Sequence, residues 1–142
     1  MINSERNETI LLLIWGQALV ALLGSLFYSE ILGYTPCDLC WMQRIFMYPL
    51  VVIYGVAAIK KDLSIALPGL ILSGIGALVS IYHYLIQKLA AFQSIGDVCG
   101  EVPCNLQYVN YLGFITIPFL AATAFILIFI LHIVLLVQNR RK

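Results

Sequence analysis

Four long stretches of the sequence contain almost no charged residues, and they constrain the fold more than any other feature. They cover about residues 10–28, 41–59, 65–87 and 112–137. A helix that crosses a membrane needs about 20 apolar residues, and each stretch approaches or exceeds that length. Short polar segments between such helices favour antiparallel neighbours. The sequence therefore predicts an all-α integral membrane protein, with four transmembrane helices in an antiparallel bundle that forms a single domain over residues 1–142.

The composition argues against a water-soluble domain. Of the 142 residues, 62% are hydrophobic and 11% are charged, whereas soluble domains have about 45–50% apolar and about 25% charged residues. So short a chain cannot hide this much apolar surface in its own interior, and lipid must be its solvent. The net charge is only +1, which provides no basic face for phosphates and argues against a nucleic acid partner.

The basic residues predict the orientation in the membrane, because lysine and arginine are enriched in cytoplasmic segments. Six of the eight fall on one predicted side: Arg6, Lys60, Lys61, Arg140, Arg141 and Lys142. We therefore expect a multi-pass protein of the cell membrane with both termini in the cytoplasm. Glu5 and Glu8 dilute the positive charge before the first apolar stretch, so we expect that stretch to be a retained helix rather than a signal peptide.

All four cysteines lie in the two predicted extracytoplasmic segments, where disulfides persist: Cys37 and Cys40 in the first, Cys99 and Cys104 in the second. Several pairings are possible. A turn over residues 100–103 would bring the later pair within the Cα separation of about 4.4–6.8 Å that a disulfide needs. Zinc held by the four thiols is an alternative, but the oxidising face and the wider second spacing argue against a metal. Purely structural disulfides are another alternative.

Residues 37–44, CDLCWMQR, combine two cysteines with an arginine at the start of the second apolar stretch. The C-x-x-C spacing favours reversible redox chemistry, because one thiol can attack the other's mixed disulfide. If a helix begins near Cys40, then Cys37, Cys40 and Arg44 share one face, at i, i+3 and i+7. The helix N-terminus and Arg44, about 6 Å along the axis, both favour a thiolate at Cys40.

Arg44 has two interpretations. An arginine within the bilayer usually marks a functional site, but its side chain can also extend to the lipid headgroups. The alignment with Cys40 favours function. The sequence has no haem or iron–sulfur ligand set and no dinucleotide fingerprint, so a lipid-soluble quinone beside Cys40 fits as electron acceptor. Arg44 would then stabilise negative charge on a quinone oxygen.

The stretch CDLCWMQR resembles the C-x-L-C-x-x-Q-R signature of the DsbB family of quinone-dependent thiol oxidases. The later stretch VPCNLQYVNYLGFITIPFL resembles the shorter BdbC-type members, and the similarity extends over nearly the whole chain. The related vitamin K epoxide reductases carry their quinone-side C-x-x-C in a late helix, so the cysteine order here favours DsbB.

The resemblance implies roles for the first cysteine pair. Cys37 and Cys40 match the quinone-side pair, with Cys40 facing the quinone, which would be menaquinone or ubiquinone. Arg44 matches the quinone-contacting arginine, and Gln43 is a second candidate beside it. His83, in the outer third of the third helix, lies at a depth from which it could approach the quinone, although a packing role is the alternative.

The resemblance also implies roles for the second pair and a partner. Cys99 and Cys104 match the loop pair that oxidises a soluble, DsbA-like thiol oxidase of the thioredoxin fold. Cys99 would be attacked by the partner's thiolate, and Cys104 would pass the electrons on to Cys37. No metal is implied.

Two other classes of function compete with this enzyme. A small four-helix transporter would typically need an embedded carboxylate, whereas every Asp and Glu here falls in a loop or near a helix end. A structural membrane protein stapled by disulfides would leave Arg44 and the doubled cysteine pairs as coincidences. Pro118 either kinks the fourth helix or belongs to its first turns, and His132, near the inner end of that helix, is predicted to be structural.

Overall fold

In the computed structural model, residues 5–141 are described, and they form an all-helical fold. The long helices of this range are α1 (Glu5–Leu26), α2 (Asp38–Lys60), α3 (Leu67–Lys88) and α5 (Ile117–Arg140). A π-helical turn, Phe27–Ile31, continues α1, and a 3₁₀ turn, Leu63–Ala66, precedes α3. Each long helix is long and apolar enough to cross a membrane. Lys142, one of the basic residues used to predict orientation, lies outside the described residues.

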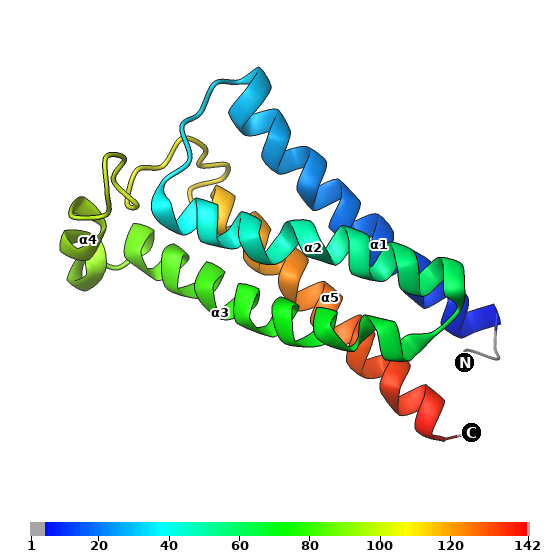
Figure 1. Cartoon of the computed structure of the whole chain (residues 1–142). Coiled ribbons are helices and arrows are strands. Elements are labelled where there is room, and N and C mark those ends of the chain that lie inside the picture. Colours follow the sequence, from blue (N-terminus) through cyan, green and yellow to red (C-terminus); the bar gives the residue numbers. More distant parts are fainter. Residues whose placement is uncertain (1–4, 142) are drawn as a thin grey trace.

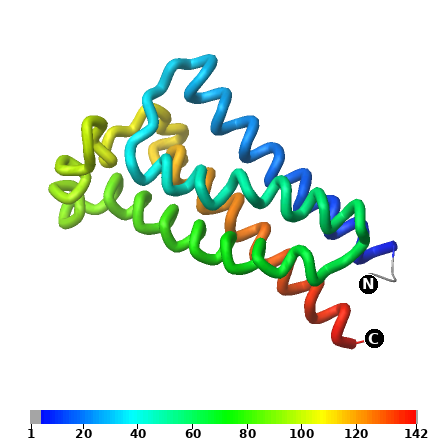
Figure 2. Tube along the Cα trace, viewed as in Figure 1, coloured from blue at the N-terminus to red at the C-terminus, as the bar shows by residue number. Residues whose placement is uncertain are grey.

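The helices form a closed ring of antiparallel neighbours. α1 packs against α2, α2 against α3, α3 against α5, and α5 against α1. In Figure 1 the start of α1, the turn between α2 and α3 and the end of α5 lie at one end of the bundle, and α4 lies at the opposite end. The trace in Figure 2 shows both cysteine-bearing segments at the end that carries α4. The two cysteine segments therefore come together although about 60 residues separate them.

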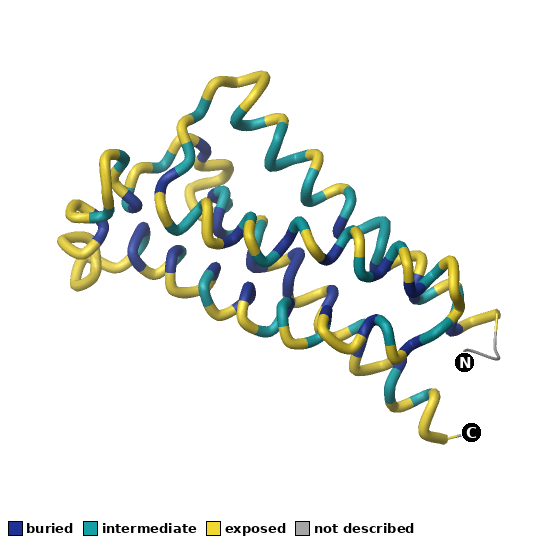
Figure 3. The backbone as a smooth tube through the Cα atoms, in the orientation of Figure 1, coloured by how far each residue is buried: buried dark blue, intermediate teal, exposed yellow. Residues whose placement is uncertain are grey.

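The surface of the bundle suits a lipid solvent. Figure 3 shows buried residues along the inward faces of the helices and exposed residues along their outward faces. Many of the exposed residues are large and apolar, such as Ile59 at 83%, Leu78 at 69% and Val20 at 66% exposure. A soluble protein could not present this many apolar side chains to water without associating.

The helix bounds differ from the predicted ones where the backbone conformation overrides hydropathy. The last helix was predicted from residue 112, but it begins at Ile117. Leu112 and Gly113 have φ of 55° and 83°, a left-handed conformation that cannot continue a right-handed helix. Pro118 lies in the first turn of α5, where its missing N–H has no partner to lose. This placement decides between the two interpretations of Pro118.

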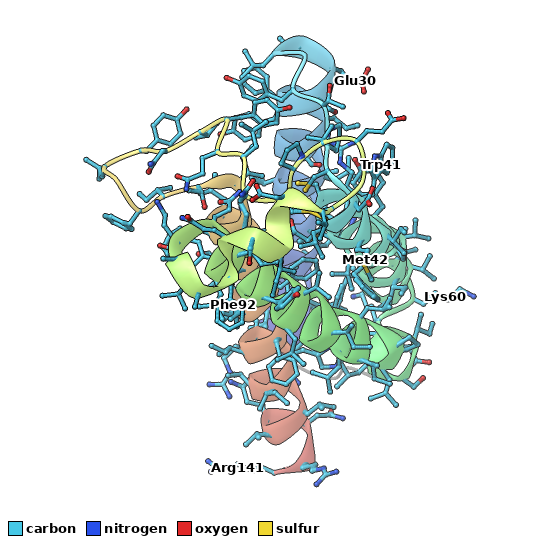
Figure 4. The ribbon with its side chains drawn as sticks, turned by 90° about the vertical axis from the view of Figure 1, so that its left-hand side faces the viewer. Glu30, Trp41, Met42, Lys60, Phe92 and Arg141 are labelled. Carbon is cyan, nitrogen blue, oxygen red and sulfur yellow. A yellow bond between two sulfur atoms is a disulfide. The ribbon has the colours of Figure 1, made fainter. Side chains whose placement is uncertain are left out.

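A short helix, α4 (Ala90–Asp97), was not predicted. It occupies the second cysteine-bearing segment and begins after Leu89, whose extended backbone ends α3. Phe92, labelled in Figure 4, projects from it. Eight residues are too few for a reliable helical period to be recognised in the sequence.

The half of the bundle away from α4 is packed around aromatic side chains. The Tyr54 hydroxyl lies 2.6 Å from Nδ1 of His132, which joins α2 to α5. Both side chains are fully buried, so the bond satisfies the Tyr54 hydroxyl and one ring nitrogen of His132, which would otherwise face hydrocarbon. Tyr54 also lies over Gly69, where there is no room for a Cβ. The bond to Tyr54 gives His132 a packing and hydrogen-bonding role in the core.

Candidate active site

Cys37 and Cys40 lie where the first cysteine segment enters α2. Cys37 is the N-cap residue with an extended backbone, and Cys40 belongs to the first turn. Both are free thiols, and their Sγ atoms are hydrogen-bonded at 3.2 Å. Cys37 is buried and Cys40 is half-buried. The helix starts earlier than the predicted residue 41, so Cys37 rather than Cys40 occupies the N-cap position.

This position makes Cys37 acidic. The pKa of Cys37 is lowered from 9.0 to about 4, chiefly by the hydrogen bond with the Cys40 thiol; burial opposes this shift, and contact with His83 adds to it. A helix N-terminus also favours an anion at this place. The sequence predicts the favoured thiolate at Cys40, whereas the observed start of the helix places it at Cys37.

Cys99 and Cys104 form a disulfide with a Cα–Cα separation of 5.7 Å. Gly100, with φ of 61°, provides the left-handed turn between them. Cys104 is only 1% exposed, whereas Cys99 is half-buried. Cys104, Cys37 and Ile86 form one buried cluster, against which Cys40 and Cys99 also pack. The structure thus brings all four cysteines into one site and leaves Cys99 as the more accessible member of its pair.

His83 lies between the two cysteine pairs. Its Nε2 is 2.9 Å from the Cys104 carbonyl oxygen and 3.7 Å from Cys37 Sγ. Its Nδ1 is 2.9 Å from the side-chain nitrogen of Gln43. His83 is 1% exposed, and it does not line the cavity that lies between α1, α2 and α5. The structure therefore brings His83 to the cysteines rather than to that cavity.

A cavity of about 380 Å³ opens between α1, α2 and α5, in the half of the bundle that carries the cysteines. In Figure 1 the outer part of α1 diverges from α2 on this side. Cys40, Gln43 and Arg44 lie along its α2 wall, and apolar residues of α1 and α5 line much of the remainder. The structure thus brings three predicted site residues to one apolar cavity. The volume and the lining of this cavity are typical of small-molecule sites.

Arg44 is held at the wall of this cavity by two contacts. Its Nη2 donates to the Ser25 carbonyl oxygen at 3.1 Å, near the end of α1. Its guanidinium lies 5.1 Å from the centre of the Trp41 ring, a cation–π contact. Figure 4 shows Trp41 near the end of the molecule that carries Glu30, far from Arg141. Arg44 is half-buried.

Cys37, Cys40 and His83 also lie close enough together to be considered as metal ligands, with their ligand atoms within 4.8 Å of one another. However, His83 Nε2 faces a carbonyl oxygen, which can only accept a hydrogen bond. In this arrangement the nitrogen carries the proton and has no lone pair for a metal. The four-thiol zinc alternative would require the cysteines that form the Cys99–Cys104 disulfide.

Two residues of the site were missed from the sequence. Tyr48 lines the cavity, and its buried hydroxyl has no partner among residues 5–141. Gln87 donates to the Leu106 carbonyl at 3.1 Å and, more weakly, to the Cys104 carbonyl at 3.5 Å. Each lies one helical turn after a predicted site residue, since Tyr48 follows Arg44 and Gln87 follows His83 at i+4. That spacing was the available signal.

The family model described as disulfide bond formation protein DsbB matches residues 7–137. The chain belongs to the DsbB family. A probable disulfide formation protein of Oceanobacillus iheyensis is 63% identical over 140 residues, which cover 98% of this chain and 97% of that protein. Disulfide bond formation protein C of Bacillus subtilis is 53% identical over 116 residues, covering 82% and 84%. No solved structure matches the chain.

Membership of the DsbB family implies a membrane disulfide oxidoreductase. The family is linked in general to quinones, and it implies a thiol oxidase as partner. The resemblance of the chain to the DsbB family and to its BdbC-type members is thereby confirmed.

Proposed function

We propose that this protein oxidises a DsbA-like thiol oxidase of the thioredoxin fold and passes the electrons to menaquinone or ubiquinone in the cell membrane. One observation carries the proposal: the two thiols of the first pair face different neighbours. Cys40 lines the apolar cavity, whereas Cys37 packs with Cys104 of the second pair. A C-x-x-C arranged in this way connects a site within the bilayer to a loop disulfide at its surface.

The cavity residues suit a quinone. Its lining is largely apolar, as the ring and tail of a lipid-soluble molecule require. Arg44 donates one N–H to the Ser25 carbonyl oxygen, and its other N–H groups could donate to a quinone oxygen. The unpartnered Tyr48 hydroxyl, also on the wall, is a second donor. Quinone, when bound, takes up two electrons and two protons. Gln43 also lines the cavity, and its side chain is bonded to His83.

The cysteines support a defined order of exchange. A thiolate of the reduced partner attacks the half-exposed Cys99, the disulfide to Cys104 breaks, and Cys104 leaves as a thiolate. When the first pair is oxidised, Cys104 attacks Cys37, the bond to Cys40 breaks, and Cys40 leaves as a thiolate beside the cavity. The partner's second thiolate then attacks its own mixed disulfide with Cys99. The partner leaves oxidised, and its two electrons reside on the protein's thiols.

The orientation that we propose follows from charge and redox compartment. One end of the bundle carries Lys60, Lys61 and Arg140, and the other end carries both cysteine pairs. By the distribution of basic residues, the first of these ends faces the cytoplasm. The cysteines then face the oxidising side, and the whole chain acts as one membrane domain.

The test is turnover of the purified protein in detergent, with a reduced thioredoxin-fold donor and a soluble quinone. The wild-type protein is expected to reduce quinone in proportion to donor disulfide formed. Cys40→Ser is expected to abolish quinone reduction, since its cavity-side sulfur is lost. Unchanged turnover in Cys40→Ser would refute the mechanism. A transporter or a stapled structural protein would show no donor-dependent quinone reduction at all.

A further inference from the structure

Two of the hydrogen bonds of His83 determine which ring nitrogen carries the proton. The Cys104 carbonyl oxygen can only accept, so His83 Nε2 must donate to it. The side-chain nitrogen of Gln43 can only donate, so His83 Nδ1 must accept from it. Both contacts measure 2.9 Å and both specify the same neutral tautomer, with the proton on Nε2.

The donating Nε2–H contacts both cysteines that exchange electrons between the two pairs. It bonds the backbone of Cys104 and approaches Cys37 Sγ at 3.7 Å. Gln87, one turn further along α3, donates to the same Cys104 carbonyl at 3.5 Å. The outer end of α3 therefore holds the Cys104 backbone against the N-terminus of α2, in the cluster that contains Cys37 and Ile86.

We propose that His83, in the tautomer set by Gln43, is a positioning residue that holds Cys104 beside Cys37 for exchange between the two cysteine pairs. This role deepens the proposed function and rests on it. In the exchange step, the Cys104 thiolate forms a bond to Cys37 Sγ while the Cys37–Cys40 bond breaks and Cys40 leaves as a thiolate. No proton passes through His83, since its Nε2–H only donates and its Nδ1 is occupied by Gln43.

This role differs from the quinone contact that sequence depth suggested. Cys40, Gln43 and Arg44 line the cavity, but His83 and Cys37 do not. His83 is separated from the cavity by Gln43, to which it is bonded. Loss of His83 is therefore expected to slow transfer between the pairs and to leave quinone affinity largely intact.

A quinone-free experiment tests the positioning directly. The double variant Cys40→Ser/Cys99→Ser retains only Cys37 and Cys104, and diamide oxidises two neighbouring thiols to a disulfide while it is itself reduced to the hydrazide. The rate of Cys37–Cys104 closure is followed by alkylation and mass spectrometry. Adding His83→Phe is expected to slow closure about tenfold, as for loss of a buried hydrogen bond. Adding His83→Gln, which keeps an N–H at a similar reach, is expected to restore most of the rate.

His132→Phe serves as the matched control, because it replaces another fully buried histidine in the inner half of the bundle. It is expected to leave closure unchanged. Equal closure rates in the His83→Phe and His132→Phe backgrounds would overturn the proposal. So would a nitrogen-15 spectrum of the folded wild-type protein that showed His83 protonated on Nδ1, a measurement that needs no variant.

Quinone turnover of the single variant His83→Gln, with all cysteines present, separates this inference from the proposed function. An unchanged KM for quinone is expected, and a raised KM with normal closure would overturn the positioning role. A wild-type protein that fails to reduce quinone would instead refute the proposed function, while the closure rates would still report on His83.

Discussion

Gly76 of α3 lies against the ring of Phe125 on α5, and this contact allows a stability prediction with a defined magnitude. A Cβ at position 76 would stand 2.5 Å from Phe125 Cζ and 2.6 Å from Cδ1. Carbon atoms in contact prefer about 3.5–4.0 Å, so the ring would have to move by about 1 Å or more. Phe125 is fully buried, and it also lines the cavity. Gly76→Ala is therefore expected to affect both stability and the cavity.

The magnitude follows from two opposing terms. Overpacking a well-packed core costs about 1–3 kcal/mol, whereas alanine gains about 0.5–1 kcal/mol over glycine within a helix. Because the buried ring has little room to move, we expect Gly76→Ala to lower the free energy of unfolding by about 1–2 kcal/mol. Gly16→Ala is the control, since a Cβ there meets nothing within 4 Å. It is expected to be neutral or to stabilise by up to about 1 kcal/mol.

Reversible unfolding in mixed micelles, followed by circular dichroism, measures both variants against the wild type. Quinone KM provides a second measurement, because a displaced Phe125 would narrow the cavity and raise KM in Gly76→Ala alone. If the two glycine variants unfold with the same free energy and show the same KM, Gly76 does not pack closely against Phe125 and the reasoning is refuted.

Three further predictions concern charge and hydrogen bonding. The pKa of Cys37 is lowered to about 4 from 9.0, so its thiolate contributes fully to the stability of the reduced protein above about pH 9 and progressively less as the pH falls towards about 4. The unfolding midpoint of the reduced wild type should therefore fall over this window relative to Cys37→Ser. Tyr54→Phe removes the bond to His132 and should cost about 1–3 kcal/mol in unfolding, whereas Tyr48→Phe removes an unpartnered hydroxyl and should be neutral or stabilising. Arg44→Ala should raise the KM for quinone more than it slows donor exchange, and Arg44→Lys should lie between it and the wild type, because lysine keeps the charge but loses the planar fork.

Each of these has a contrary outcome. Parallel pH profiles for the reduced wild type and Cys37→Ser would show that Cys37 titrates as an ordinary thiol. Equal destabilisation by Tyr54→Phe and Tyr48→Phe would contradict the assigned hydrogen bonding. If Arg44→Ala slows only donor exchange, Arg44 does not belong to the quinone site.

Some parts of the site could be predicted from the sequence, and others could not. The sequence was sufficient to predict that Cys40 and Arg44 face the same side of α2. The two residues are four positions apart in one helix, and that spacing alone fixes their relative direction. His83 could be given a depth in the membrane but no neighbour. Its partners Gln43 and Cys104 come from other segments of the chain, and only helix packing determines which groups meet there.

The bounds of the helices could also be predicted only in part from the sequence. Hydropathy located the spanning helices, because burial in lipid requires long apolar runs whatever their neighbours. It placed the start of the last helix too early, since Leu112 is apolar yet adopts a left-handed backbone. It also missed α4, because so short a helix depends on tertiary contacts more than on its own sequence.

By itself, the sequence predicted a four-helix membrane protein with two cysteine pairs, the first of them beside an arginine. Length, hydropathy and spacing along one helix are properties of the chain and need no partner. The tertiary structure decided which helices form the cavity beside Cys40, which cysteines are joined, and that a histidine connects the two pairs. These features depend on how α2 and α3 dock against the loop that carries Cys104, and that docking is set by packing between distant segments.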